Sequence, residues 1–181
     1  MGSKMKISRI QTPQEFWDGV VVPDYNDFKS SIDDLRLAFH CAISLFHMSD
    51  WIYETHKVVI NGTLRFNDRK TGKSKPVNRA TEYANYISDS HPDFELIRQI
   101  ANTAKHLKLT STSPHPNAPS HAANTAVGRT GWGQGSWGQG PWGGTPRVML
   151  ANHPGQTDLE FTAIAQSVFE MWLTLRNRDG W

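Results

Sequence analysis

The segment 27–56 constrains the fold more than any other part of the chain, because apolar residues recur around nearly its whole circumference at helical spacing. One broad stripe consists of Ile32, Leu35, Phe39, Ile43, Phe46 and Tyr53. Further apolar residues fall on the other sides. A helix that is apolar all round belongs in a core. We therefore expect a central buried helix over 27–56, with the rest of the chain packed against it.

The same segment carries three polar side chains that a core must accommodate, His40, His47 and Asp50. Asp50 projects into the main apolar stripe, where an unpaired carboxylate would be costly. We expect a polar seam in which these groups bond to each other or to Asn102, Lys105 and His106 of a second helix. A metal centre is the alternative, but a di-metal bundle needs Glu-x-x-His pairs from two helices, and neither Glu82 nor Glu95 begins one. We expect no metal and no cofactor.

Length and composition indicate one domain that does not depend on disulfides. The chain has 181 residues and a single cysteine, Cys41, within the central segment. A buried thiol in a reducing compartment is the simplest interpretation, since no activating base is assigned to it for a nucleophilic role. No signal peptide is recognised, residues 1–11 resemble a disordered start, and the most apolar run is too short and polar to span a bilayer. A soluble, cytoplasmic protein is expected.

Helix signals recur on both sides of the central segment. Thr12, Pro13 and Glu15 predict a capped short helix, followed by an extended link over 20–23. Asn61-Gly62 predicts a tight turn in a small hairpin over 58–66. A moderate helix is expected from about residue 76 to 90, and a strong one begins at 90–93 and runs to about 107.

A Pro- and Gly-rich excursion over 108–157 separates the last two long helices. Its flanks, 106–112 and 147–152, are expected to pair as the base of an antiparallel hairpin. Thr157 and Glu160 predict a capping box that opens the final helix. The fold class is therefore mainly α: a single domain over 1–181, with an up-down bundle of about four helices and a small antiparallel β-hairpin between the last two long helices.

Two unusual stretches have more than one interpretation. Within 65–79 the chain has six basic residues and a single acid, Asp68. This run is either a solvated loop or a patch that binds phosphate and hence nucleic acid. The basic residues are Arg65, Arg69, Lys70, Lys73, Lys75 and Arg79. The net charge of +2 does not decide between them. In the excursion a tryptophan recurs every five residues, a period of neither helix nor strand. The indoles concerned are those of Trp132, Trp137 and Trp142. We consider three roles for them: packing onto the bundle, forming a self-association surface, or stacking on a ligand.

The second strong helix ends in a cluster of polar residues. Asn102 and His106 lie four apart on one face, with Arg98 one turn earlier. A central helix bearing FHCAISLFHMSDW and a helix ending in ANTAKHLKL make the chain resemble HEPN-like proteins. It is most similar to bacterial members with an Asn-x-x-Lys-His stretch and a Gly-rich hairpin. The resemblance covers about residues 14–175.

The resemblance implies a homodimer and a link to RNA. Active HEPN ribonucleases place an arginine and a histidine from each of two protomers at the dimer interface and cleave RNA without a metal. Here Asn102 and His106 match the family's polar residue and histidine, but Ala101 stands where the family has arginine. Losing that cation removes about 3 kcal/mol of transition-state stabilisation.

We therefore expect a non-catalytic HEPN-like interaction module that binds RNA or a protein partner. One alternative is a toxin- or defence-type ribonuclease that uses His106 with Asn102 and either Arg98 or Lys105. The other is a small-molecule-binding bundle with a cavity beside His47, Asp50 and His106. No membrane partner is expected.

Overall fold

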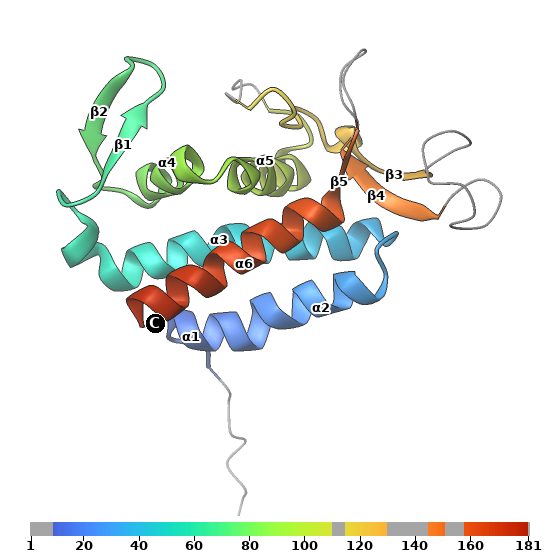
Figure 1. Cartoon of the computed structure of the whole chain (residues 1–181), viewed down its shortest axis with the longest axis horizontal. Coiled ribbons are helices and arrows are strands. Elements are labelled where there is room, and N and C mark those ends of the chain that lie inside the picture. Colours follow the sequence, from blue (N-terminus) through green and yellow to red (C-terminus); the bar gives the residue numbers. More distant parts are fainter. Residues whose placement is uncertain (1–8, 110–114, 130–144, 151–157, 181) are drawn as a thin grey trace, which may run out of the picture.

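The computed structural model describes residues 9–109, 115–129, 145–150 and 158–180, and this part of the chain is mainly helical (Figure 1). The helical elements are α1 (Pro13–Phe16), the π-helical η1 (Trp17–Val21), α2 (Val22–Ser30), α3 (Leu35–Ile60), α4 (Ala80–Ser90), α5 (Pro92–His106), the 3-10 turn η2 (Ala122–Asn124) and α6 (Phe161–Asp179). The strands are β1 (Arg65–Asp68), β2 (Lys73–Pro76), β3 (Thr125–Arg129), β4 (Pro146–Leu150) and β5 (Leu159–Glu160).

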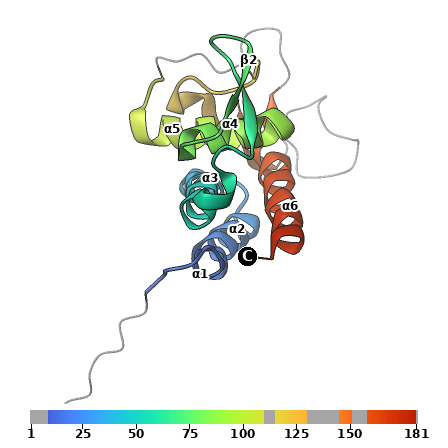
Figure 2. The same ribbon diagram turned by 90° about the vertical axis from the view of Figure 1, so that its left-hand side faces the viewer.

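Helix α3 lies at the centre of the helical body. It packs against α2, α4, α5 and α6. In Figure 2 it lies between the α4–α5 pair on one side and α2 on the other, with α6 alongside. Its inward residues are fully buried, and Trp172 of α6 donates an indole hydrogen bond of 3.0 Å to the Leu45 carbonyl. The predicted core role of this segment is confirmed.

The predicted start of that helix is wrong. Residues 27–30 end α2, and the chain turns over 31–34 before α3 begins at Leu35. Asp34 is the N-cap, and its Oδ1 accepts a 3.1 Å hydrogen bond from the Leu37 backbone N–H. A cap of this kind satisfies a backbone donor that the first helical turn leaves free. A short polar break thus divides one apolar run into two helices.

The amino-terminal capping box is confirmed, whereas the extended link after it is wrong. Thr12 Oγ1 accepts from the Glu15 N–H at 3.1 Å, and the Glu15 carboxylate accepts from the Thr12 N–H at 3.2 Å. Residues 20–22 continue as η1 and α2, with Pro23 in the first turn of α2. Helical geometry buries Trp17 and Val21 on one side, which an extended link would not do.

The first hairpin lies further along the chain than Asn61-Gly62 predicted. Val58 and Val59 are exposed residues in the last turns of α3, and Gly62, at φ +75°, follows the helix instead of turning a hairpin. The basic stretch is itself an antiparallel hairpin, with Arg65 opposite Pro76 and Asp68 opposite Lys73. This β1–β2 hairpin projects beyond α4 (Figure 1), so the expectation of a loop there is wrong.

A hairpin between α5 and α6 is present, but its first strand is not the predicted segment 106–112. Strand β4 pairs with β3, which begins at Thr125, and with β5. Among residues 107–109, the described part of the chain directly after α5, Lys108 forms an isolated bridge with His121. The last helix begins at Phe161, with Glu160 as its N-cap residue. The Glu160 carboxylate bonds Arg147 Nη1 at 2.6 Å and does not cap the helix, so the expected box is wrong. Thr157 lies outside the described residues.

The described elements share one apolar core. Its largest fully buried side chains come from α2, α5 and α6 as well as α3 and η1, and Phe66 of β1 and Val148 of β4 join the same cluster. In the described ranges there is no helix long and apolar enough to cross a membrane. The mainly helical class with an attached antiparallel hairpin is confirmed.

Candidate functional site

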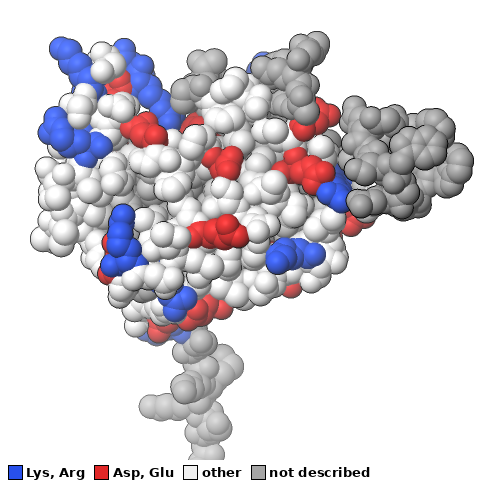
Figure 3. All heavy atoms as spheres, viewed as in Figure 1, with Lys and Arg blue, Asp and Glu red and all other residues white. Residues whose placement is uncertain are grey.

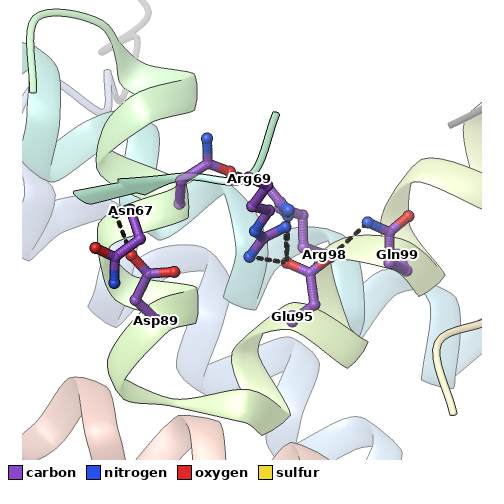
Figure 4. A network of polar contacts seen from close by, with 7 residues as sticks. Asn67, Arg69, Asp89, Glu95, Arg98 and Gln99 are labelled. Carbon is purple, nitrogen blue, oxygen red and sulfur yellow. Dashed lines mark hydrogen bonds and ion pairs between the residues drawn. The ribbon is translucent and has the colours of Figure 1, made fainter. Parts of the chain in front are cut away.

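A buried carboxylate joins the β1–β2 hairpin to the helical body (Figure 4). Glu95 of α5 is only 2% exposed. Its Oε2 atom accepts from both terminal nitrogens of Arg69 at 3.3 Å and forms an ion pair with Arg98. Its Oε1 atom accepts from Gln99 Nε2 at 2.7 Å. One acid therefore holds the turn of the hairpin against α5.

Contacts within this network hold the Arg98 side chain in place. Arg98 Nη1 donates to the Asn85 side-chain oxygen of α4 at 2.7 Å, while Nη2 pairs with Glu95. Burial lowers the pKa of Arg98, and the charge of Glu95 opposes that shift. The guanidinium nevertheless stays protonated, because an arginine side chain remains charged in proteins even when buried. The guanidinium that the ribonuclease alternative would use is thus engaged by Glu95 and Asn85.

A second contact fixes the first strand of the hairpin. The backbone N–H of Asn67 donates to the Asp89 carboxylate at the end of α4, over 2.8 Å (Figure 4). Asn67 and Arg69 are thereby held by two different helices. The strand and the turn of the hairpin cannot swing independently of α4 and α5 without breaking these bonds.

The hairpin exposes basic side chains. Figure 3 shows Lys and Arg spheres gathered over it. Arg65 reaches across to Ser74, bonding its hydroxyl at 3.1 Å and its carbonyl at 2.9 Å. Lys70, Lys73 and Arg79 are exposed and make no ion pair with any described residue. These cations are free to meet an external anion.

Asp68 is neutralised within the hairpin. Its carboxylate pairs with Lys75 and accepts hydrogen bonds from the Thr71 hydroxyl at 2.7 Å and the Lys70 N–H at 3.1 Å. These bonds, that of Lys75 above all, lower the pKa of Asp68 to about 2. The acid therefore closes the turn and leaves the surface of the hairpin basic.

The residues that carry the HEPN resemblance lie at the far end of α5. Lys105 and His106 are exposed and Asn102 is half-buried. The next residue, Leu107, has φ +60° and ψ −49°, and the Lys108 N–H donates to the His106 carbonyl at 2.6 Å. This is a γ-turn of the strained, positive-φ kind. It ends the helix directly after His106.

The expected polar seam is instead a pocket on another face of α3. His40, His47 and Asp50 line it together with Asp24 of α2, whereas Asn102, Lys105 and His106 do not. His47 Nδ1 lies 2.8 Å from Asp50 Oδ2. The Asp50 side chain is 41% exposed, so the expectation that it projects into the buried stripe is wrong. Solvent and His47 satisfy the carboxylate.

Sequence reasoning missed the residues at the centre of the network, Glu95, Gln99, Asn85 and Asp89. One signal was present: Glu95, Arg98 and Gln99 are spaced three and four apart, so they share one helix face. Neither Asn85 nor Asp89 carried a comparable signal, because their partners lie in other elements.

The remaining candidates add no site. Cys41 is fully buried, and burial raises its pKa, with the charge of Asp24 as a smaller cause. No group of three or more potential metal ligands occurs among the residues that the structure describes. Trp132, Trp137 and Trp142 lie outside those residues.

Comparisons with known proteins provide no relative. No protein-family model, curated protein or solved structure matches this chain.

Proposed function

We propose that this chain is a non-catalytic HEPN-like helical module that binds RNA through the β1–β2 hairpin. The single observation that carries the proposal is the anchored basic hairpin. It exposes Lys70 and Lys73, neither of which has an ion-pair partner among the described residues, while Glu95 and Asp89 hold its turn and first strand. Lysine and arginine side chains bind phosphate and release counterions from the nucleic acid, which provides affinity without reading the sequence.

Anchoring favours binding because the cations are positioned before the ligand arrives. A free loop would lose conformational entropy on binding, at a cost of about 0.5–1.5 kcal/mol per immobilised side chain. The Arg69–Glu95 pair and the Asn67–Asp89 bond restrain the hairpin already in the free protein. A basic surface also favours a polyanion over an apolar protein partner.

Two observations support binding without cleavage. Ala101 occupies the place of the family's arginine, and Arg98, the nearest substitute, is committed to Glu95 and Asn85. His106 is exposed and lies close to the strained turn at Leu107. A histidine alone contributes about 10² to 10⁴ to the rate by acid–base catalysis, which falls short of an efficient ribonuclease.

RNA binding can be tested by fluorescence anisotropy with a short, labelled, mixed-sequence single-stranded RNA at several salt concentrations. We compare the wild type with Lys70→Gln/Lys73→Gln. A matched control, Lys29→Gln/Arg36→Gln, removes the same charge from α2 and the start of α3. The hairpin variant should bind several-fold more weakly, and its slope of log K against log salt should fall by about 1.4, or roughly 0.7 for each lost contact with a single strand.

Equal losses in the two variants would show that net charge alone drives binding, and would contradict the proposal. So would unchanged affinity in the hairpin variant. RNA degradation that disappears in His106→Ala would instead support the ribonuclease alternative.

We also propose that the module is a homodimer, as the resemblance implies. Sedimentation velocity over a range of protein concentrations tests this directly. A single species with the 20.4 kDa mass of one chain at all concentrations would contradict it.

A further inference from the structure

We propose that the pocket between the α1–η1–α2 segment and α3 binds a small organic cation with an apolar body. Its ammonium group would be held by Asp24 and Asp50, and its apolar part would lie against Phe16 and Trp51. This site is separate from the basic hairpin, and it does not depend on RNA binding.

The pocket has the size and lining of a ligand site. Its volume is about 460 Å³, within the range of about 300–1,000 Å³ that is usual for small-molecule pockets. Val20 and Ile43 contribute aliphatic surface to the lining. An apolar wall with a few convergent polar groups is the typical arrangement of such sites.

Phe16 and Trp51, which both line the pocket, pack against each other. Their ring centroids are 5.0 Å apart and their planes differ by 17°, so the two rings stack. Stacking holds each ring in place before a ligand binds.

The polar groups of the pocket are mostly acceptors. Asp50 engages Nδ1 of His47, so in the neutral imidazole Nε2 is left as an acceptor. The Ser44 hydroxyl donates to the Cys41 carbonyl at 3.1 Å and is thus already occupied. Asp24 makes no ion pair with another described residue. Acceptors of this kind require a donor as ligand.

The charge of the pocket is complementary to a cation. Two carboxylates, Asp24 and Asp50, line it, and no lysine or arginine of the described residues does. The imidazoles of His40 and His47 also line the pocket. An anionic ligand would meet repulsion from both carboxylates, and a neutral one would leave Asp24 without a charged partner.

The backbone of η1, which contributes Val20 to the pocket, has an uncommon π-helical geometry. Val20 comes from η1, where the Val22 N–H bonds the Trp17 carbonyl five residues earlier. Such π-helical turns are rare and occur frequently at functional sites. This turn contributes Val20 to the lining of the pocket.

The test is a titration of ¹⁵N-labelled full-length protein with benzylammonium, benzyl alcohol and benzoate, followed by NMR. We expect saturable shifts of the Trp51 indole and of Ile43 with benzylammonium. Its affinity should exceed that of the neutral alcohol by about tenfold, corresponding to about 1.4 kcal/mol for the charged contact. Benzoate should bind more weakly than either.

Matched variants distinguish the pocket from general electrostatics. Asp24→Asn/Asp50→Asn should lose about tenfold in affinity for benzylammonium, whereas Asp27→Asn/Asp33→Asn, at exposed acids outside the pocket, should bind like the wild type. Equal affinity for the alcohol, preference for benzoate, no saturable shift at Trp51, or an equal effect of the two variants would each overturn the proposal. Lys70→Gln/Lys73→Gln should leave these shifts unchanged.

Discussion

At the scale of single residues, Glu95 determines how the hairpin is held. It is a buried acid whose two oxygens are used by Arg69, Arg98 and Gln99. Such a group is costly to desolvate, and the cost is repaid only when every partner is present. Removing one member of the network should therefore lower the free energy of unfolding by an amount that depends on how deeply that member is buried.

Glu95→Ala should lower the free energy of unfolding by about 3 kcal/mol, because it leaves the buried guanidinium of Arg98 uncompensated. Arg69→Ala should cost about 1 kcal/mol, since the Arg69 side chain is 29% exposed and is partly screened. Urea denaturation measures both. The control is Glu54→Ala, which breaks the exposed pair with Lys57 and should cost at most about 0.5 kcal/mol. Similar losses in all three variants would contradict a special role for Glu95.

Asp68 should make the hairpin sensitive to acid. Hydrogen bonds from Lys75, Thr71 and the Lys70 N–H lower its pKa to about 2, from an ordinary value of 3.8. Because the pKa is depressed in the folded state, the carboxylate contributes stability above about pH 4. That contribution is lost as the pH falls through about 2.

NMR measures this directly, since the amide signals of Lys70 and Thr71 should titrate with a midpoint near pH 2. In Asp68→Asn this step should be absent. A midpoint close to 3.8 in the wild type would show that the turn does not stabilise the charged carboxylate.

At the scale of elements, the termini of the helices decide where the strands can form. Asn61-Gly62 is a typical hairpin dipeptide, yet here it follows the last turn of α3. A hairpin turn and a helix C-terminus both use a residue that tolerates positive φ, so the Asn-Gly dipeptide alone does not distinguish them. Continuing α3 to Ile60 buries Ile60 in the core, while Val58 and Val59 remain exposed.

Gly62→Ala should destabilise the protein by about 1 kcal/mol, because an L-residue at φ +75° is strained even though no atom lies within 4 Å of the added Cβ. The control is Gly19→Ala within η1, where the added Cβ would make an ordinary 3.8 Å contact with Ile10. That variant should be neutral or stabilising by up to about 1 kcal/mol. Thermal denaturation compares the two. A loss in Gly19→Ala as large as in Gly62→Ala would contradict the conformational explanation.

At the scale of the whole molecule, one core connects the helices with both small sheets. Phe66 of β1 and Val148 and Leu150 of β4 belong to the same buried cluster as Phe94 of α5 and Trp172 of α6. Neither described sheet has an apolar core of its own, and two- or three-stranded sheets of this size are marginal without support.

The described elements should therefore unfold in one cooperative transition. We expect the urea midpoint from circular dichroism, which reports the helices, to coincide with the midpoints from NMR signals of Phe66 and Val148. Loss of the Val148 signal at a clearly lower urea concentration would show that the β3–β4–β5 sheet unfolds separately from the helices.

Prediction from sequence was most accurate where local chemistry is sufficient. The capping box of Thr12 and Glu15, the start of α5 after His91 and the core role of α3 are all present. Each depends on residues within a few positions of one another. Predictions that required a distant partner were less accurate, as with the strand opposite β4 and the expected contact between Asp50 and α5.

The sequence by itself thus determined the helical class, the central apolar helix and the basic composition of the segment 65–79. Only the tertiary structure decided that Arg69 meets Glu95, 26 residues away, and that Asp24 and Asp50 face one pocket. The physical reason is that periodicity shows which face of an element is buried, but not what lies against it. Desolvation and pairing of charges depend on that neighbour, so both candidate sites appear only once the elements are packed.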